Sequence, residues 1–100
     1  MFVYNISFQI APNLEMQWLE WMKSKMIPLF ESTNCFTENK FYKLDVEKDQ
    51  APTYTLQLFA TTQSQLDKSL TMHDDSLLKE LSATWGDQCF HFATKMQIVN

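Results

Sequence analysis

Two histidines and two cysteines are the side chains of this sequence best suited to acid–base, nucleophilic or metal chemistry. His73 lies on the apolar stripe of a predicted helix and directly precedes Asp74 and Asp75. A neighbouring carboxylate can orient an imidazole for proton transfer, which makes His73 the candidate catalytic residue. The alternative interpretation is a histidine near a helix C-terminus, where its charge interacts favourably with the helix dipole.

Cys89 and His91 are two residues apart on a predicted strand and therefore share one face of it. Cys35 begins a different strand, which the predicted topology places at the far corner of the sheet. The chain has no Cys-x-x-Cys or His-x-x-x-His spacing, so we expect neither a metal site nor a disulfide. The single glycine, Gly86, excludes a glycine-rich phosphate loop, and we expect no cofactor.

The length and the charge of the chain exclude further classes of function. The 100 residues make one domain, residues 1–100, with a formal net charge of −4. All eight basic residues are lysines and they are scattered, so we expect no nucleic-acid binding and no binding to an anionic membrane. The start of the chain has no cationic segment followed by a long apolar run, and two cysteines fit a reducing compartment. We therefore expect a cytoplasmic protein.

Hydrophobic periodicity divides the chain into strands and helices. Alternating residues predict four strands, and apolar residues at helical spacing predict two helical segments between them. The strands span residues 2–10, 35–47, 53–61 and 88–99, and the helical segments span residues 14–30 and 64–85. The order β-α-β-β-α-β predicts an α+β, ferredoxin-like fold, in which a four-stranded antiparallel sheet has both helical segments on one face. The first and third strands should be central.

Local signals predict where the helical segments begin, bend and end. Asn13 is the expected N-cap of the first segment, and Pro28 should kink or end it. Ser64 and Asp67 resemble a capping box for the second segment, and the run 74–76 predicts a break and a new helix. Gly86 is the expected C-cap.

The sheet face away from the helices is polar but almost uncharged in its central strands. It carries Val3, Asn5, Ser7, Gln9, Thr53, Thr55, Gln57 and Phe59. A sheet face in contact with bulk water usually carries Lys and Glu, whereas amides and hydroxyls suit a covered, partly wet interface. We therefore predict a homodimer in which two sheets pack face to face. The alternative is a monomer with an open face.

The first helical segment is rich in aromatic and methionine side chains. Together with the facing strands it offers Tyr4, Trp18, Met22 and Tyr54 as a pocket for a small apolar ligand. The alternative is an ordinary helix-on-sheet core, which has the same helical spacing. Trp21, at the margin of the apolar stripe, is the residue of this helix that we expect to contact a ligand or partner.

Several of these residues together resemble a known group of proteins. The shared motifs are Tyr4-Asn5, Trp18-Leu19-Glu20-Trp21-Met22-Lys23, Ile27-Pro28, Cys35-Phe36, the strand Tyr54 to Phe59, His73, and Gly86-Asp87 followed by Phe90. In order and over nearly the whole chain, they resemble the dimeric α+β barrel proteins, which include antibiotic-biosynthesis-monooxygenase-like domains. Within that group the chain is most similar to short bacterial proteins of unknown function. The resemblance implies the fold and homodimerisation, but no established activity.

One position departs from the pattern of that group. A histidine commonly precedes the Ile-Pro pair, whereas this chain has Met26 there. A role that relatives assign to that histidine therefore cannot be carried by this chain in the same way.

Two functions remain open at this point. The first is a non-enzymatic dimeric binding or structural module. The second is a cofactor-independent enzyme of oxygenase or isomerase type that acts on an apolar aromatic molecule, with His73 as base, Trp18 as a wall and Asn5 or Tyr54 orienting the ligand. A cavity bordered by Trp18, Met22 and His73 would favour the second.

Overall fold

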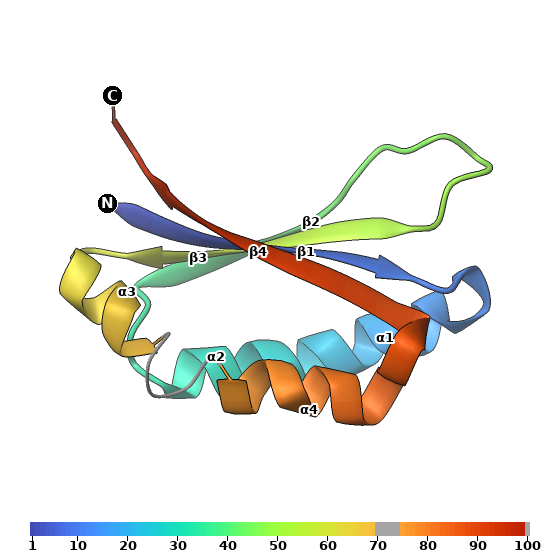
Figure 1. Ribbon diagram of the computed structural model, residues 1–100, viewed down its shortest axis with the longest axis horizontal. Helices are drawn as coiled ribbons and strands as arrows, with labels where there is room; N and C mark the ends of the chain where they lie inside the picture. The colour runs from blue at the N-terminus through green and yellow to red at the C-terminus, as the bar shows by residue number, and fades with distance from the viewer. Residues whose placement is uncertain (70–74, 100) are drawn as a thin grey trace.

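The computed structural model describes residues 1–69 and 75–99 (Figure 1). Its sheet contains β1 (Phe2–Ile10), β2 (Glu38–Lys43), β3 (Thr53–Ala60) and β4 (Cys89–Gln97) in the order β2-β3-β1-β4. All three pairings are antiparallel. The ferredoxin-like fold is thus confirmed, with the first and third strands in the centre of the sheet. β2 is shorter than predicted, since residues 35–37 and 44–47 of the predicted strand lie outside it. A turn through Asn34, whose φ is 59°, separates α2 from the segment that leads into β2.

The first helical segment runs past Pro28 instead of ending there. A short 3-10 turn (Pro12–Leu14) leads into α1 (Glu15–Trp21), then a π-helical turn (Met22–Met26) and α2 (Ile27–Ser32). The wider π turn, which ends two residues before Pro28, accommodates a residue that has no N–H to donate. Within this turn the Ser24 hydroxyl donates to the Glu20 carbonyl at 2.8 Å. The prediction that Asn13 caps the helix is wrong, since no side-chain cap is formed at this end.

The second helical segment consists of α3 (Gln63–Ser69) and α4 (Asp75–Trp85). α3 begins one residue before Ser64, and the Gln65 N–H donates to Thr62 Oγ1 at 3.1 Å. Thr62 therefore makes the capping bond that the sequence analysis assigned to Ser64. A separate helix through Trp85 is confirmed, while the residues just before α4, and with them His73, lie outside the described part of the chain. Gly86 has a φ of 58° after α4, as its expected C-cap role requires.

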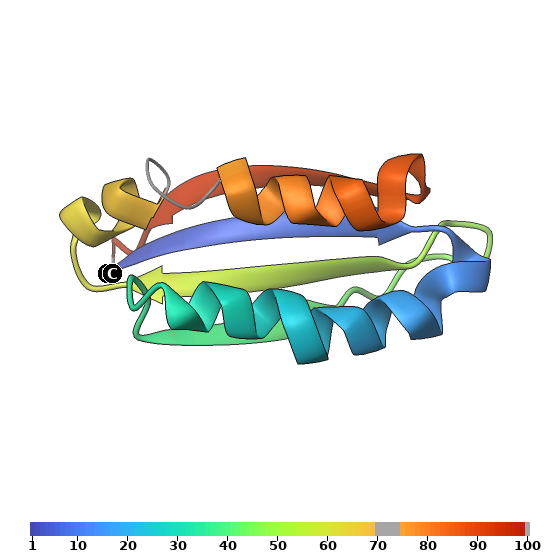
Figure 2. The ribbon, with the colours of Figure 1, turned by 90° about the horizontal axis from the view of Figure 1, so that it is seen from below.

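Helices α1 to α4 lie on one side of the sheet, and the opposite side is open (Figure 1). Seen from the helix side, α1 and α2 run along the β3–β2 half of the sheet, and α4 runs along the β1–β4 half (Figure 2). The core between the layers is apolar, and its largest fully buried side chains include Trp18, Phe8 and Phe30. Within residues 1–69 and 75–99, no helix has the length and hydropathy to cross a bilayer.

Candidate functional site

The seven side chains predicted for a dimer face all lie on the open side of the sheet. Asn5 pairs with Gln57, Ser7 with Thr55 and Gln9 with Thr53, while Phe59 pairs with Val3. Cross-strand partners share a face, and their neighbours Tyr4, Ile6, Phe8, Tyr54, Leu56 and Leu58 are buried beneath the helices. Ser7 Oγ and Thr55 Oγ1 lie 3.3 Å apart, so these two hydroxyls satisfy each other across the central strands.

The edge strands add two features that the central strands do not have. By register, Phe90, Phe92 and Met96 of β4 lie opposite Gln9, Ser7 and Val3 and share the open face with them. Phe90 is 62% exposed and Phe92 is 55% exposed, and their ring centroids are 6.3 Å apart. Such an exposed aromatic pair beside a neutral polar surface is typical of an interaction site.

Among the four strands, the charge on the open face lies at the β2 edge. Lys40 Nζ lies 3.8 Å from a Glu38 carboxylate oxygen and 5.6 Å from the centroid of the Phe59 ring. The face therefore changes from charged at β2, through neutral amides and hydroxyls, to aromatic at β4. The sequence analysis did not predict the charged pair on β2 or the aromatic pair on β4. The aromatic pair could have been found, because residues of β4 paired with Ser7 and Gln9 must point to the same side of the sheet as these two.

The side chains predicted for a ligand pocket lie together in the core between helices and sheet. Tyr4 and Tyr54 are each 4% exposed, and Trp18 and Met22 are fully buried. The Trp18 ring lies 5.1 Å from the Tyr54 ring and 5.4 Å from the Phe8 ring, measured between centroids. The arrangement is a packed aromatic cluster, and its use for a ligand stays a prediction. Asn5 is on the opposite side of the sheet and cannot orient a molecule held beside Trp18.

Two indole N–H groups of this interior have no hydrogen-bond partner among the described residues. They belong to Trp18 and Trp85, and both nitrogens are shielded from solvent. Trp85 also packs edge-on against Trp21, with 5.8 Å between ring centroids, and so links α4 to α1. A buried donor without an acceptor costs about 1–3 kcal/mol, so such groups need an explanation.

The side chain of Cys89 interacts with the indole of Trp18. Burial raises the pKa of the Cys89 thiol to about 11, and the indole N–H of Trp18 offsets part of that rise. Sulfur is a weak acceptor, which leaves Trp18 without a full hydrogen bond. Cys35 is also buried, and both cysteines are free. Among residues 1–69 and 75–99, no group of three or more His, Cys, Asp or Glu side chains could hold a metal ion.

A polar cluster that the sequence analysis missed lies where α1 begins. The Tyr54 hydroxyl donates to Glu15 Oε2 at 2.6 Å, and Lys43 Nζ lies 3.0 Å from the same oxygen. The Tyr54 hydroxyl and then Lys43 hold the pKa of Glu15 below its ordinary value. Burial, followed by the Glu15 carboxylate, raises the pKa of Tyr54 to about 12. Tyr54 is therefore a fixed donor to Glu15 and not a proton acceptor.

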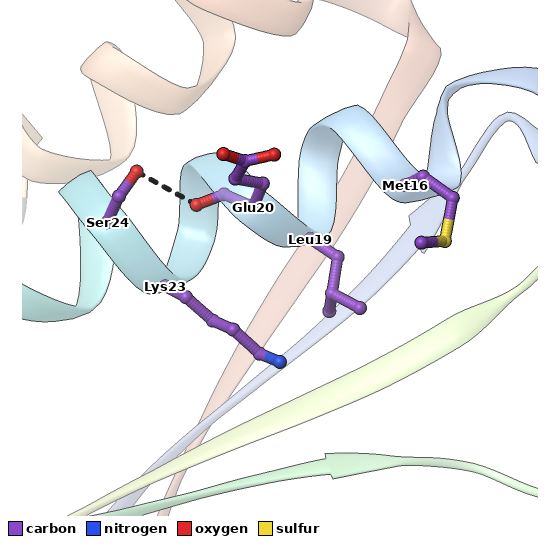
Figure 3. Close-up of a pocket in the computed structure, with 5 residues that line it drawn as sticks. All are labelled: Met16, Leu19, Glu20, Lys23 and Ser24. Atoms are coloured by element: carbon purple, nitrogen blue, oxygen red, sulfur yellow. Dashed lines mark hydrogen bonds between the residues drawn. The ribbon is translucent and has the colours of Figure 1, made fainter.

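A hollow of about 380 Å³ lies on the outer surface of α1 and the π turn that follows it (Figure 3). Its walls are Met16, Leu19, Glu20, Lys23 and Ser24, which all come from successive turns of one helical segment. Leu19 and Lys23 point to one side of the helix, and Glu20 and Ser24 point to the other. Since its lining residues all belong to this one segment, the hollow is open surface and cannot exclude water from a ligand.

Several solved structures have the same fold as this chain at very low identity. An ethyl tert-butyl ether (ethd) family protein from Bacillus halodurans matches with a TM-score of 0.74 and 11% identity, over 99% of this chain and 100% of that one. A dimeric ferredoxin-like protein from an uncultured marine organism matches with a TM-score of 0.70 and 6% identity, over 99% and 95% of the chains. A mutant of SnoaB, a cofactor-independent oxygenase from Streptomyces nogalater, matches with a TM-score of 0.67 and 13% identity, over 99% and 93%.

These matches show the fold of this chain, which is an α+β, ferredoxin-like domain with a four-stranded antiparallel sheet. The chain belongs to the family described as domain of unknown function DUF4286, whose sequence profile matches residues 1–99. No curated protein sequence matches this chain.

Proposed function

We propose that this protein acts as a homodimeric binding module in which two copies pack their open sheet faces together. The observation that carries the proposal is the surface of that face, which is neutral along β1 and β3 and aromatic along β4. A similar solved structure is described as a dimeric ferredoxin-like protein, which supports the same assembly.

The size of the open face suits a stable dimer. In the view of Figure 2 the molecule measures 39 by 19 Å. That footprint is on the order of 700 Å², close to the ~800 Å² that each partner buries in a standard interface. Face-to-face packing would remove Phe90 and Phe92 from water, and it would leave the charges of β2 at the rim.

The test is the mass in solution, measured by size exclusion with light scattering, of the unchanged protein and of Phe92→Lys. About 100 Å² of the Phe92 ring is exposed to solvent in the isolated chain, which corresponds to about 2 kcal/mol per copy when buried. The substitution should raise the dimer dissociation constant by about 100-fold or more, since both copies carry it.

Met16→Lys is the matched control for that substitution. Met16 is 76% exposed but lies on α1, on the helix side of the sheet. This variant should keep the mass of a dimer. A monomeric unchanged protein at micromolar concentration, or a dimer that survives Phe92→Lys but not Met16→Lys, would refute the proposed assembly.

A second candidate function rests on two buried indole N–H groups: that of Trp85, which has no acceptor among the described residues, and that of Trp18, which has only the weakly accepting sulfur of Cys89. Trp18 belongs to the same buried cluster as Met22 and Met26, and a hydrogen-bond donor among soft apolar side chains suits a flat apolar molecule that carries an acceptor. A cofactor-independent oxygenase or isomerase would need such a site, and a similar fold is described as a cofactor-independent oxygenase. In this function His73 would serve as the base, and no cofactor or metal is required.

Native mass spectrometry of freshly purified protein tests this second candidate. A retained small aromatic molecule that is lost in Trp18→Phe would support it. A clean protein mass, combined with tryptophan fluorescence that does not respond to aromatic quinones or phenols, would leave only the binding module. Both functions are proposed for a cytoplasmic protein that binds neither nucleic acid nor membrane. The scattered lysines and the net charge of −4 support the absence of these two kinds of binding, and the two cysteines fit the location.

A further inference from the structure

Three side chains that are easily oxidised are in contact with one another inside the domain. The Trp18 ring is fully buried, and its centroid lies 5.1 Å from the centroid of the Tyr54 ring. The Trp18 indole also interacts with the thiol of Cys89. Tryptophan, tyrosine and cysteine lose a single electron more readily than the apolar side chains around them, and rings in contact exchange an electron quickly. An electron can therefore pass between these side chains without any movement of the chain.

The hydroxyl of Tyr54 meets a carboxylate that can accept its proton. It donates to Glu15 Oε2 at 2.6 Å, and Glu15 lies at the start of α1, where its side chain is partly exposed. A phenol that loses one electron becomes a much stronger acid than a carboxylic acid, so its proton leaves for the nearest acceptor. A short hydrogen bond to a charged oxygen supplies that acceptor already in position. The structure thus prepares Tyr54 to lose an electron and a proton together.

The charges around this pair favour oxidation of Tyr54 over oxidation of Trp18. Oxidised Trp18 would carry a positive charge on a fully buried ring among apolar side chains, and an unpaired buried charge is costly. Oxidised Tyr54 is neutral once its proton is on Glu15. The positive charge that remains is that of Lys43, which lies 3.0 Å from the same carboxylate oxygen and is exposed. Transfer from Trp18 to Tyr54 therefore moves net positive charge out of the core.

The other neighbours of Trp18 compete poorly with Tyr54. Burial raises the pKa of the Cys89 thiol to about 11, so this sulfur stays protonated at neutral pH, and a thiol is oxidised less readily than a thiolate. The ring centroids of Phe8 and Phe41 lie 5.4 Å and 6.0 Å from that of Trp18, but phenylalanine resists oxidation. These two rings shield Trp18 from water, and Tyr54 is the neighbour that can reduce it.

We propose that Tyr54 and Glu15 form a radical site, which reduces oxidised Trp18 by coupled transfer of an electron and a proton. One electron moves from the Tyr54 ring to Trp18, and the hydroxyl proton moves from Tyr54 Oη to Glu15 Oε2. The products are restored Trp18, a neutral phenoxyl radical on Tyr54 and a protonated Glu15. The oxidant that first takes the electron from Trp18 is an organic radical of the aromatic class, which is itself reduced by that electron.

A soluble reductant of the thiol or enediol class resets the site. It gives one electron to the Tyr54 radical and becomes a radical itself, while Glu15 returns the proton to Tyr54 Oη. The site would thus remove oxidising equivalents from the interior of the domain before they damage it. The inference goes beyond both proposed functions and depends on neither, because ultraviolet light oxidises tryptophan with no ligand bound.

Laser photolysis of the full-length protein tests the proposal. An ultraviolet pulse ejects an electron from tryptophan, and transient absorption then follows the tryptophan radical and the tyrosyl radical separately. In the unchanged protein we expect the tryptophan signal to decay while a tyrosyl signal grows. In Tyr54→Phe the tyrosyl signal should be lost and the tryptophan radical should persist. Tyr42→Phe is the matched control, since Tyr42 is exposed, and it should behave like the unchanged protein.

Substitutions of the tryptophans identify the partner of Tyr54. The chain has three tryptophans, so Trp21→Phe and Trp85→Phe made together leave Trp18 alone. This double variant should still form the tyrosyl radical. Trp18→Phe should lose it, although Trp21 and Trp85 are still oxidised by the pulse.

Two substitutions at the carboxylate separate proton transfer from a structural role. Glu15→Gln preserves the size of the side chain but is a much weaker proton acceptor, and should slow formation of the tyrosyl radical by about tenfold or more. Lys43→Met breaks the ion pair, but it removes a charge that lowers the proton affinity of Glu15, so it should not slow the transfer. A purely structural cluster would respond alike to both. The transfer in the unchanged protein should also be slower in D2O, because a proton moves with the electron.

The proposal is overturned if the unchanged protein forms no tyrosyl radical, if Tyr54→Phe still forms it, or if Tyr42→Phe loses it. It is also overturned if the double tryptophan variant loses the transfer, or if Lys43→Met slows it as much as Glu15→Gln. Equal rates in H2O and D2O would exclude the proton step. Thermal unfolding checks that each variant is folded. Should Glu15→Gln fail to fold, the comparison of H2O with D2O in the unchanged protein still decides the outcome.

Discussion

Removing the Tyr54 hydroxyl should cost stability in a way that depends on pH. In Tyr54→Phe the Glu15 carboxylate loses its 2.6 Å hydrogen bond and keeps the Lys43 ammonium at 3.0 Å. A hydrogen bond to a charged group contributes about 1.5–3 kcal/mol. Because the Glu15 side chain is 20% exposed and the carboxylate keeps Lys43 as a partner, we expect the lower part of that range, about 1.5–2 kcal/mol.

The assay is thermal unfolding between pH 3 and pH 7. For a domain of this size, about 1.5–2 kcal/mol lowers the Tm by about 6–16 °C. The pKa of Glu15 is lowered in the folded state, so its stabilising effect is present above its ordinary pKa and is lost as the pH falls through the folded value. The difference between Tyr54→Phe and the unchanged protein should therefore be full at pH 7 and shrink towards pH 3.

The Tyr54 hydroxyl also makes stability depend on pH in alkaline solution. The pKa of Tyr54 is raised from 10.0 to about 12, so its contribution is present below pH 10 and is lost as the pH rises through about 12. Tyr42→Phe is the control, since Tyr42 is 44% exposed and its hydroxyl makes no hydrogen bond to the described residues. Equal Tm values for Tyr54→Phe and the unchanged protein, or a difference that does not change between pH 7 and pH 3, would refute this reasoning.

Three further predictions concern local features of the fold. The pKa of the Cys89 thiol is raised from 9.0 to about 11, so at pH 8 Cys89 should react with a disulfide reagent about 100-fold more slowly than in the unfolded chain. Rapid labelling of the native protein would contradict the burial of this thiol. In urea unfolding, Thr62→Ala should destabilise the protein by about 1 kcal/mol and Ser64→Ala by less than about 0.5 kcal/mol. A larger effect of Ser64→Ala would contradict the assignment of Thr62 as the cap of α3. Gly86→Ala should lower the free energy of unfolding by about 1 kcal/mol, because the φ of Gly86 is 58°. Nothing lies within 4 Å of the added methyl group, so this cost comes from the backbone and not from a clash. Unchanged stability would mean that the turn has another conformation.

The strand pattern of the sequence was sufficient to predict the sheet. The alternation from Phe2 to Ile10 assigns each β1 residue to a face, and the buried Ile6 and Phe8 beside the half-exposed Asn5 and Ser7 bear it out. The order of the elements then restricts the topology, because crossover connections are right-handed and short. The alternation of residues along a strand and the order of the elements can both be read from the sequence without knowledge of tertiary contacts.

Predictions at the helix ends were less accurate, since several residues compete for each role. Thr62 and Ser64 are equally good capping residues by type, and the start of α3 at Gln63 decides between them. Pro28 is a strong helix-ending signal, but the π turn before it allows the helix to continue to Ser32. Met22 and Met26, the first and last residues of that turn, are fully buried, but helical periodicity alone does not distinguish a π turn from an α-helical one.

The polar cluster at α1 could not be read from the sequence at all. Glu15, Lys43 and Tyr54 come from a helix and two strands, and they meet only after the sheet has formed. By its position in the first turn of α1, Glu15 needs no partner outside the helix, and Tyr54 was predicted to be a member of a ligand pocket. The open face, by contrast, was predicted in its centre and missed at its β4 edge, where Phe90 and Phe92 add the exposed aromatic surface.

The contact between two open faces can be measured directly by isotope-filtered NMR. A sample would mix labelled and unlabelled copies, so that only contacts between copies give signals. We predict intermolecular signals from the Phe92 ring and the Thr55 methyl group, and none from the Met16 methyl group on α1. Signals from Met16 alone, or no intermolecular signal in a sample that sediments as a monomer, would contradict the account.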